Sequence, residues 1–317
     1  MNTPPTLDDI RAAHARIAPH IRRTPVLTSA LLDREAGARL FFKCENFQKA
    51  GAFKSRGACN AVFSLAAAEA QRGVATHSSG NHAAALARAV GLRGIAAYVV
   101  MPDNSAKPKQ QAVAGYGGQI VLCAPTLQAR ERACRAVMDT TGATLIHPYN
   151  DDRIIAGQGT AAIELLEEVP DLDLVIAPVG GGGLLSGTAL AVNALRPAAR
   201  VIGAEPEQAG DAAASKKAGH IVSQPANTIA DGLRTLLGEK TFPVIRDHVD
   251  DIATVTEDGI VAAMRRIWEV LKIVVEPSGA VPFAAVREHG GLFAGKRVGL
   301  ILSGGNVDLD ALPWVRK

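Results

Sequence analysis

Short apolar runs that alternate with helix-forming segments constrain the fold of this chain more than any other feature of its sequence. Between Gly73 and Pro148 four such runs follow one another, at residues 74–77, 95–101, 120–123 and 144–147. Alternation of this kind is typical of consecutive βα units, whose strands pair in parallel. We therefore predict a small inserted lobe over residues 73–148 with its own parallel sheet.

A second series of the same kind predicts a larger lobe, formed by residues 1–72 and 149–317. Its expected strands are residues 39–44, 174–179, 201–205 and 297–302, and its expected helices are residues 55–70, 154–168, 184–195 and 260–271. Thr6 is a suitable N-cap for an opening helix, whereas residues 211–251 give no clear pattern. The predicted fold is α/β, with two lobes of open parallel sheet. Ligands of such sheets bind at the carboxyl ends of the strands, so we expect the active residues there.

The composition excludes several classes of function. The 317 residues carry a formal net charge of +3 with scattered basic residues, and only 4% are aromatic, which argues against a nucleic-acid partner. No apolar stretch approaches the roughly 20 residues that span a bilayer. The four cysteines form no C-x-x-C pair, as expected of reduced core residues. We expect a cytoplasmic protein without a membrane partner.

Lys54 is the first candidate for chemistry, because it stands at a predicted helix start among small and apolar residues in Ala50–Ala58. Such surroundings partly desolvate an amine, which favours its neutral, nucleophilic form. An amine of this kind can form a Schiff base. A solvated surface lysine is the commoner case, so the neighbouring motifs have to support this interpretation.

Four consecutive glycines form the second motif, because Gly180, Gly181, Gly182 and Gly183 follow a predicted strand and precede a helix. Their backbone N–H groups can approach an anion closely, and the helix N-terminus adds its positive dipole. The motif predicts a phosphate site. A dinucleotide site is the rival reading, with Glu205 as the ribose-binding acid, but Ser186 stands where a third glycine or alanine belongs.

Two further motifs lie at strand ends. Ser78-Ser79-Gly80-Asn81-His82 opens a helix after the strand at 74–77, and its hydroxyls, amide and free N–H groups suit a carboxylate ligand. An ordinary N-cap cluster is the alternative. Ser303-Gly304-Gly305-Asn306 follows the last strand and is by itself only a turn.

Together the four motifs resemble the serine/threonine dehydratase and serine racemase family, pyridoxal phosphate (PLP) enzymes of the tryptophan-synthase-β type, also called fold type II. The similar segments include Ala52-Phe53-Lys54-Ser55-Arg56-Gly57-Ala58, and further ones lie at residues 41–48, 156–160 and 255–258. The resemblance covers nearly the whole chain. It implies a homodimer that acts on a small amino acid.

The resemblance also implies a role for each matching residue. Lys54 would form the Schiff base with PLP and Phe53 would pack beside the cofactor ring. Gly180 to Gly183 and the amide of Leu184 would hold its phosphate. Asn81 would bind the ring hydroxyl, Ser303 would face the pyridine nitrogen, and the substrate carboxylate would lie at Ser78, Asn81 and His82. A serine is a neutral partner, unlike an aspartate, which keeps the ring nitrogen protonated, so the ring withdraws fewer electrons and prompt loss of a β-leaving group is favoured.

The family places a divalent cation at Glu205, the carbonyl of Ala209 and Asp211, and this chain keeps that spacing. Carboxylate and carbonyl oxygens suit Mg²⁺ or Ca²⁺. Two solvated acids near a strand end are the alternative.

The implied reaction is dehydration of a small L-hydroxyamino acid of the serine/threonine type to a 2-oxo acid and ammonia, with serine racemase or 3-hydroxyaspartate dehydratase as the alternative. Ser79 stands where ordinary threonine dehydratases have alanine, and its hydroxyl can exchange a proton with the substrate on the face opposite Lys54, or merely cap the helix.

Since the chain ends soon after Ser303, we expect no regulatory domain. A nicotinamide oxidoreductase and a non-catalytic amino-acid-binding protein stay open, and a reactive Lys54 argues against both.

Overall fold

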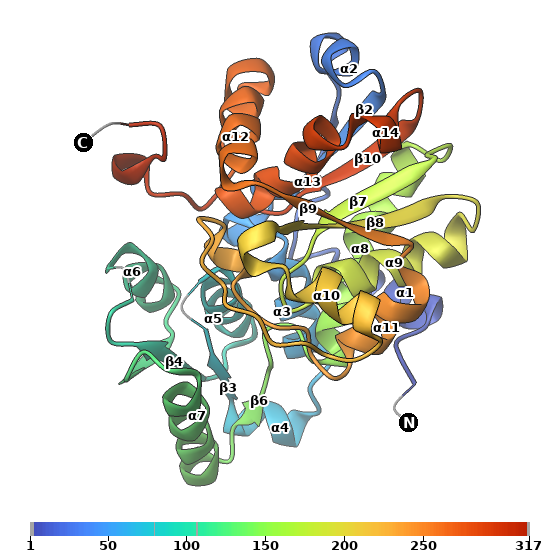
Figure 1. Ribbon diagram of the computed structural model, residues 1–317. Coiled ribbons are helices and arrows are strands. Elements are labelled where there is room, and N and C mark those ends of the chain that lie inside the picture. Colours follow the sequence, from blue (N-terminus) through green and yellow to red (C-terminus); the bar gives the residue numbers. More distant parts are fainter. Residues whose placement is uncertain (1–2, 79, 106, 316–317) are drawn as a thin grey trace.

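Two separate sheets form the framework of the protein in this computed structural model, which describes residues 3–78, 80–105 and 107–315 (Figure 1). The larger sheet has six strands in the order β1-β2-β10-β7-β8-β9, and the smaller has four in the order β5-β4-β3-β6. All neighbouring strands are parallel except the short β1, which pairs antiparallel with β2. The larger sheet consists of β1 (Val26–Leu27), β2 (Arg39–Cys44), β7 (Leu174–Pro178), β8 (Arg200–Pro206), β9 (Asp251–Val255) and β10 (Arg297–Leu302). The smaller consists of β3 (Val74–His77), β4 (Ala97–Pro102), β5 (Gln119–Cys123) and β6 (Thr144–Leu145).

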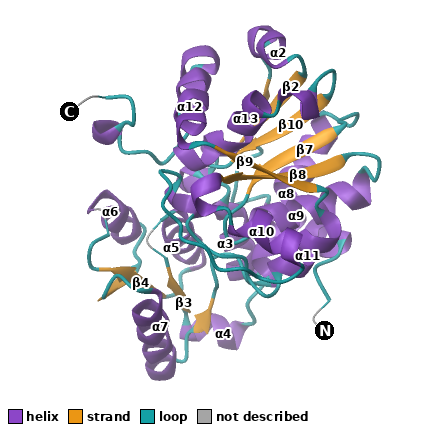
Figure 2. Ribbon diagram, in the orientation of Figure 1, coloured by secondary structure: helices purple, strands orange, loops and turns teal. Residues whose placement is uncertain are grey.

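Helices cover the sheets and join them (Figure 2). Helices α3 and α5 pack against each other and lie between the two sheets (Figure 1). The helices of the first half are α1 (Leu7–Ile17), α2 (Ala30–Ala36), α3 (Lys54–Phe63), α4 (Ala67–Arg72), α5 (Asn81–Arg93), α6 (Lys107–Gly115) and α7 (Leu127–Thr141). Those of the second half are α8 (Asp152–Glu168), α9 (Gly183–Leu195), α10 (Asp211–Ala218), α11 (Thr241–His248), α12 (Glu257–Leu271), α13 (Pro277–Glu288) and α14 (Gly290–Phe293).

The predicted parallel α/β fold is confirmed, and the smaller sheet lies within residues 73–148. The exact division into lobes stays a prediction. Helix α1 begins as expected, because the Thr6 hydroxyl accepts a hydrogen bond from the amide of Asp9 and the Asp9 carboxylate accepts one from the amide of Thr6. Among the described residues, no helix is both long and apolar enough to cross a bilayer.

The predicted helix over residues 55–70 is wrong in one respect, because it is two helices, α3 and α4, separated by residues 64–66. The Arg93 guanidinium donates to the carbonyls of Val62 and Leu65, and the Glu69 carboxylate accepts a hydrogen bond from the amide of Ala66. These bonds satisfy the end of one helix and the start of the next, so the break is stable. Residues 211–251, which gave no pattern, contain α10 and α11.

A buried network of charges fixes α3 to β2 and α8. The Arg56 guanidinium donates to both oxygens of Glu45, with Nε–Oε2 and Nη2–Oε1 distances of 2.7 Å, and to both oxygens of Glu164 on α8 at 2.8 and 2.7 Å. Lys43 on β2 adds a second cation, with its Nζ 2.7 Å from Glu164 Oε2. Burial alone would raise the pKa of Glu164, but the hydrogen bonds and charges of Arg56 and Lys43 outweigh it and lower that pKa to about 2. Two cations thus balance two anions inside the protein.

Replacing Arg56 should destabilise the protein strongly. In Arg56→Leu two carboxylates stay buried beside one cation, so we expect the free energy of unfolding to fall by about 3–5 kcal/mol, measured by urea denaturation. Arg265 and Glu269 form an exposed Arg–Glu pair on α12, so Arg265→Leu is the matched control, with an expected loss of about 0.5 kcal/mol or less. Equal losses in the two variants would contradict this account of the network.

Candidate active site

Lys54 is the first residue of α3 and follows a tight, strained connection. Ala50 and Gly51 have positive φ angles of 55° and 71°. The amide of Phe53 donates to the carbonyl of Ser303 at 2.9 Å, and Ala52 forms an isolated bridge with Gly304. The turn is therefore fixed to the carboxyl end of β10, which brings Phe53 and Lys54 beside Ser303. Phe53 and Ser303 are about 250 residues apart in the sequence, so only the fold brings them together.

The Lys54 amine has the electrostatic character of a nucleophile. Its Nζ donates to the carbonyl of Pro148 at 2.9 Å, and no salt bridge to it occurs among the described residues. Burial lowers the pKa of Lys54 to about 8, although the charge of Glu276 opposes this shift. A substantial fraction of the amine is therefore neutral near physiological pH.

The glycine loop between β7 and α9 is shaped to hold an anion. Gly182 has a φ of 89°, and a Cβ atom at Gly181 would lie 2.3 Å from a ring carbon of Tyr149, so neither position tolerates a side chain. Within the described part of the chain, no protein acceptor pairs with the backbone N–H groups of residues 180–184. These free amides at the N-terminus of a thirteen-residue helix suit a phosphate.

The first turn of α5 lies beside the start of α13 and the segment after Ser303. Asn81 donates from Nδ2 to Glu276 Oε1 at 2.8 Å, and its Oδ1 accepts from Asn306 Nδ2 at 3.0 Å. These bonds tie α5 to the start of α13 and to the segment after Ser303. Ser79 lies outside the described residues. Ser78, the residue after β3, is joined to the smaller sheet by its amide, which donates to the carbonyl of Val100.

The environment of His82 limits how it can bind a carboxylate. Its ring is buried, and its Nε2 lies 3.3 Å from the carbonyl of Ile146. Burial and the charge of Lys54 keep its pKa well below the usual value, so the neutral ring donates from Nε2 and keeps a lone pair on Nδ1. A lone pair does not bind a carboxylate. Contact with a substrate carboxylate would therefore use the backbone N–H of His82 rather than its side chain.

Several residues near Lys54 were not identified from the sequence. The rings of His77, His147 and Tyr149 form a series of perpendicular contacts, with centroid distances of 5.4 and 4.6 Å. Arg130 on α7 lies close enough that its charge lowers the pKa of both His77 and Tyr149, although burial is the largest influence on each. Its buried Nε has no hydrogen-bond partner within the described ranges.

The two acids predicted to bind a cation are buried in one place. Glu205, at the end of β8, accepts hydrogen bonds from the amides of Ala212 and Ala213, both at 2.9 Å, and Asp211 accepts one from the amide of Leu237 at 3.1 Å. Burial raises the pKa of Glu205 to about 8 and that of Asp211 to about 6. Neither forms a salt bridge with a described residue, and no cluster of three or more His, Cys, Asp or Glu side chains suited to a metal occurs among those residues. Two buried carboxylates without a counter-ion fit a cation that takes its other ligands from backbone or water.

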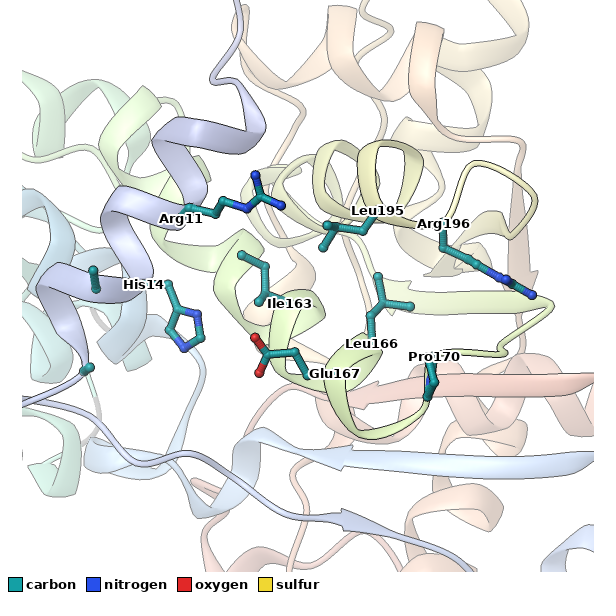
Figure 3. A pocket seen from close by; sticks show the side chains of 10 residues that line it. Arg11, His14, Ile163, Leu166, Glu167, Pro170, Leu195 and Arg196 are labelled. Atoms are coloured by element: carbon teal, nitrogen blue, oxygen red, sulfur yellow. The ribbon is translucent and has the colours of Figure 1, made fainter.

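A separate cavity of about 490 Å³ lies on another part of the surface, between α1, α8 and α9 (Figure 3). Arg11, His14 and Glu167 lie at its edge, around apolar side chains that include Ile163 and Leu195 (Figure 3). None of the site residues predicted from the sequence lines it. We therefore place the chemistry at Lys54 and not in this cavity.

The fold and this arrangement of lysine, free amides and helix N-terminus define a two-lobed α/β enzyme of the tryptophan-synthase-β type. The family profile described as "Pyridoxal-phosphate dependent enzyme" matches residues 17–304, and the chain belongs to this family. Its cofactor is PLP, which excludes the nicotinamide oxidoreductase and the non-catalytic binding protein.

Individual relatives share nearly the full length of the chain. A beta-hydroxyaspartate dehydratase of Paracoccus denitrificans is 55% identical over 311 residues, which cover 98% of this chain and 99% of the relative. A serine racemase of Arabidopsis thaliana is 53% identical over 309 residues, covering 96% and 93%. The structure of maize serine racemase superposes with a TM-score of 0.95 at 50% identity, covering 97% of this chain and 95% of that one.

The lowered pKa of Lys54 makes a prediction for the cofactor-free protein. Only the neutral amine attacks an aldehyde, so the rate of PLP binding to Lys54 should rise with pH and level off above about pH 8. An ordinary lysine would continue to gain reactivity up to its pKa of about 10.4. Stopped-flow absorbance measures the rate.

The matched control is Lys54→Ala, which should show neither the absorbance change of PLP binding to the lysine nor any turnover. Borohydride reduction of the wild type followed by peptide mapping identifies the modified residue. A modified lysine other than Lys54 would overturn the assignment.

Proposed function

We propose that the protein is a PLP-dependent lyase that removes water from a small 3-hydroxyamino acid, and that its preferred substrate is 3-hydroxyaspartate. The observation that carries this preference is Arg130, whose Nε is buried without a hydrogen-bond partner in the described part of the chain and whose charge lowers the pKa of His77. A half-buried guanidinium with a free buried N–H favours a substrate that supplies a second carboxylate. The dehydratase relative, at 55% identity, supports the same choice.

In the proposed reaction, the N-terminal turn of α5 and Ser78 orient the α-carboxylate, and Arg130 holds the distal one. The amides of residues 180–184 would hold the PLP phosphate, Phe53 would pack beside the ring, Asn81 would contact the ring hydroxyl and Ser303 the pyridine nitrogen. When bound, PLP withdraws electrons from the substrate α-carbon. Lys54 takes the α-proton, and the β-carbon–oxygen bond breaks with release of water. The released enamine is hydrolysed to oxaloacetate and ammonia.

Racemisation is the second candidate function, and the serine racemase relatives support it. The proton exchange on the second face of the substrate is assigned to the hydroxyl of Ser79, a proposal that rests on the sequence alone.

Substrate choice is tested with Arg130→Ala. We expect kcat/KM for 3-hydroxyaspartate to fall about tenfold to a hundredfold, the value of one charge-assisted hydrogen bond, while kcat/KM for serine changes little. Release of the 2-oxo acid is measured. Arg135→Ala is the matched control, because Arg135 is an exposed arginine on the same helix.

Equal losses on serine and 3-hydroxyaspartate in Arg130→Ala would contradict a role in distal carboxylate binding. Chiral analysis of the remaining substrate, with wild type and Ser79→Ala, tests racemisation in the same incubations. A variant that loses L-dehydration as severely as D-isomer turnover would refute the assignment of Ser79.

We also propose that Glu205, Asp211 and the carbonyl of Ala209 hold Mg²⁺ or Ca²⁺. The cation would replace the protons that the raised pKa values, about 8 for Glu205 and about 6 for Asp211, keep on these acids, so its affinity should increase from pH 6 to pH 8.

Thermal melts with chelator and with added Mg²⁺ or Ca²⁺ measure binding of the cation. The cation should raise the melting temperature of the wild type through mass action, and should not do so in Asp211→Asn. Asp139→Asn, at an exposed acid of α7, should behave as the wild type. An unchanged response in Asp211→Asn would place the site elsewhere.

A further inference from the structure

His147 lies at the candidate active site although no motif pointed to it. It follows β6, the parallel neighbour of β3, so it stands at the same sheet edge as His77 and Ser78. The carbonyl of the next residue, Pro148, accepts the hydrogen bond from the Lys54 amine. The ring is only partly buried.

Backbone contacts fix the protonation of the His147 ring. The amides of Tyr149 and Asn150 both point at its Nδ1, at 3.3 and 3.0 Å, so this nitrogen carries a lone pair. The proton of the neutral ring therefore sits on Nε2. Burial, together with the charges of His77 and Lys54, lowers the pKa of His147 to about 4, while Asp151 opposes the shift. The ring is thus an uncharged donor at neutral pH.

The orientation of the ring is fixed as well. His77 and Tyr149 contact it at interplanar angles of 85° and 87°, and Tyr149 occupies the space that the missing side chain of Gly181 leaves open. Within the described part of the chain, Nε2 of His147 has no hydrogen-bond partner. A preoriented donor of this kind is available to a ligand.

We infer that His147 determines substrate specificity by donating a hydrogen bond from Nε2 to the distal carboxylate of a dicarboxylic amino acid, beside Arg130. The inference rests on the proposed function. The charge of Arg130 influences the pKa of His77 and of Tyr149, the two rings that contact His147, so Arg130 and His147 lie in the same part of the protein. The α-carboxylate is assigned to the start of α5, so the second carboxylate is the group left to meet these donors.

Two substitutions distinguish the hydrogen bond from Nε2 to the substrate from the contacts by which Nδ1 holds the turn at Tyr149 and Asn150. His147→Asn keeps an acceptor for the amides of Tyr149 and Asn150 but removes the distal N–H, whereas His147→Gln keeps an N–H near the position of Nε2. The ligands are L-aspartate and L-alanine, which are 3-hydroxyaspartate and serine without the leaving group. Their dissociation constants from the PLP-loaded enzyme follow from the cofactor absorbance, and melting temperatures check the fold.

We expect His147→Asn to weaken L-aspartate about tenfold or more and to leave L-alanine nearly unchanged, with His147→Gln closer to the wild type. Equal weakening of both ligands, or unchanged L-aspartate binding in His147→Asn, would overturn the inference. A wild type that binds L-aspartate no better than L-alanine would instead refute the proposed preference for a dicarboxylic substrate. The two failures are therefore distinguishable.

Discussion

The buried contact between Arg56 and its two carboxylates is the constraint on which the active-site geometry depends. Arg56 stands two residues after Lys54 on α3, and its partners come from the end of β2 and from α8. A guanidinium with bidentate partners on two sides has one favourable position, so the start of α3 cannot rotate or slide without breaking several charge-assisted bonds. The amine of Lys54 is thereby held at the edge of the larger sheet, where Ser303 and the glycine loop also lie.

The four apolar runs between Gly73 and Pro148 all became strands of one sheet. The central strands β3 and β4 were the most predictable, because burial on both faces leaves continuous apolar runs. The motifs around Lys54, Gly180 and Ser303 were also recognisable, since each follows a strand. The break between α3 and α4 was not predictable. It depends on Arg93, which is close to Val62 only after α5 has packed.

The remaining site residues were hidden for a similar reason. Tyr149, Arg130 and Glu276 have no local pattern that indicates chemistry. The arrangement of strands and helices brings Tyr149 to the glycine loop, Glu276 near Lys54, and Arg130 near His77 and Tyr149. His77 and His147 did have a signal, because each ends a predicted apolar run on neighbouring strands. The role assigned to Ser79 rests on sequence comparison, since it lies outside the described residues.

The basic groups around Lys54 have a consequence for the energetics of ligand binding. His77, His82 and His147 all have lowered pKa values, and Lys54 titrates near pH 8. An anion that enters among them stabilises their protonated forms and raises these pKa values. Binding of a carboxylate or phosphate therefore takes up protons from solution, and its measured enthalpy depends on the ionisation heat of the buffer.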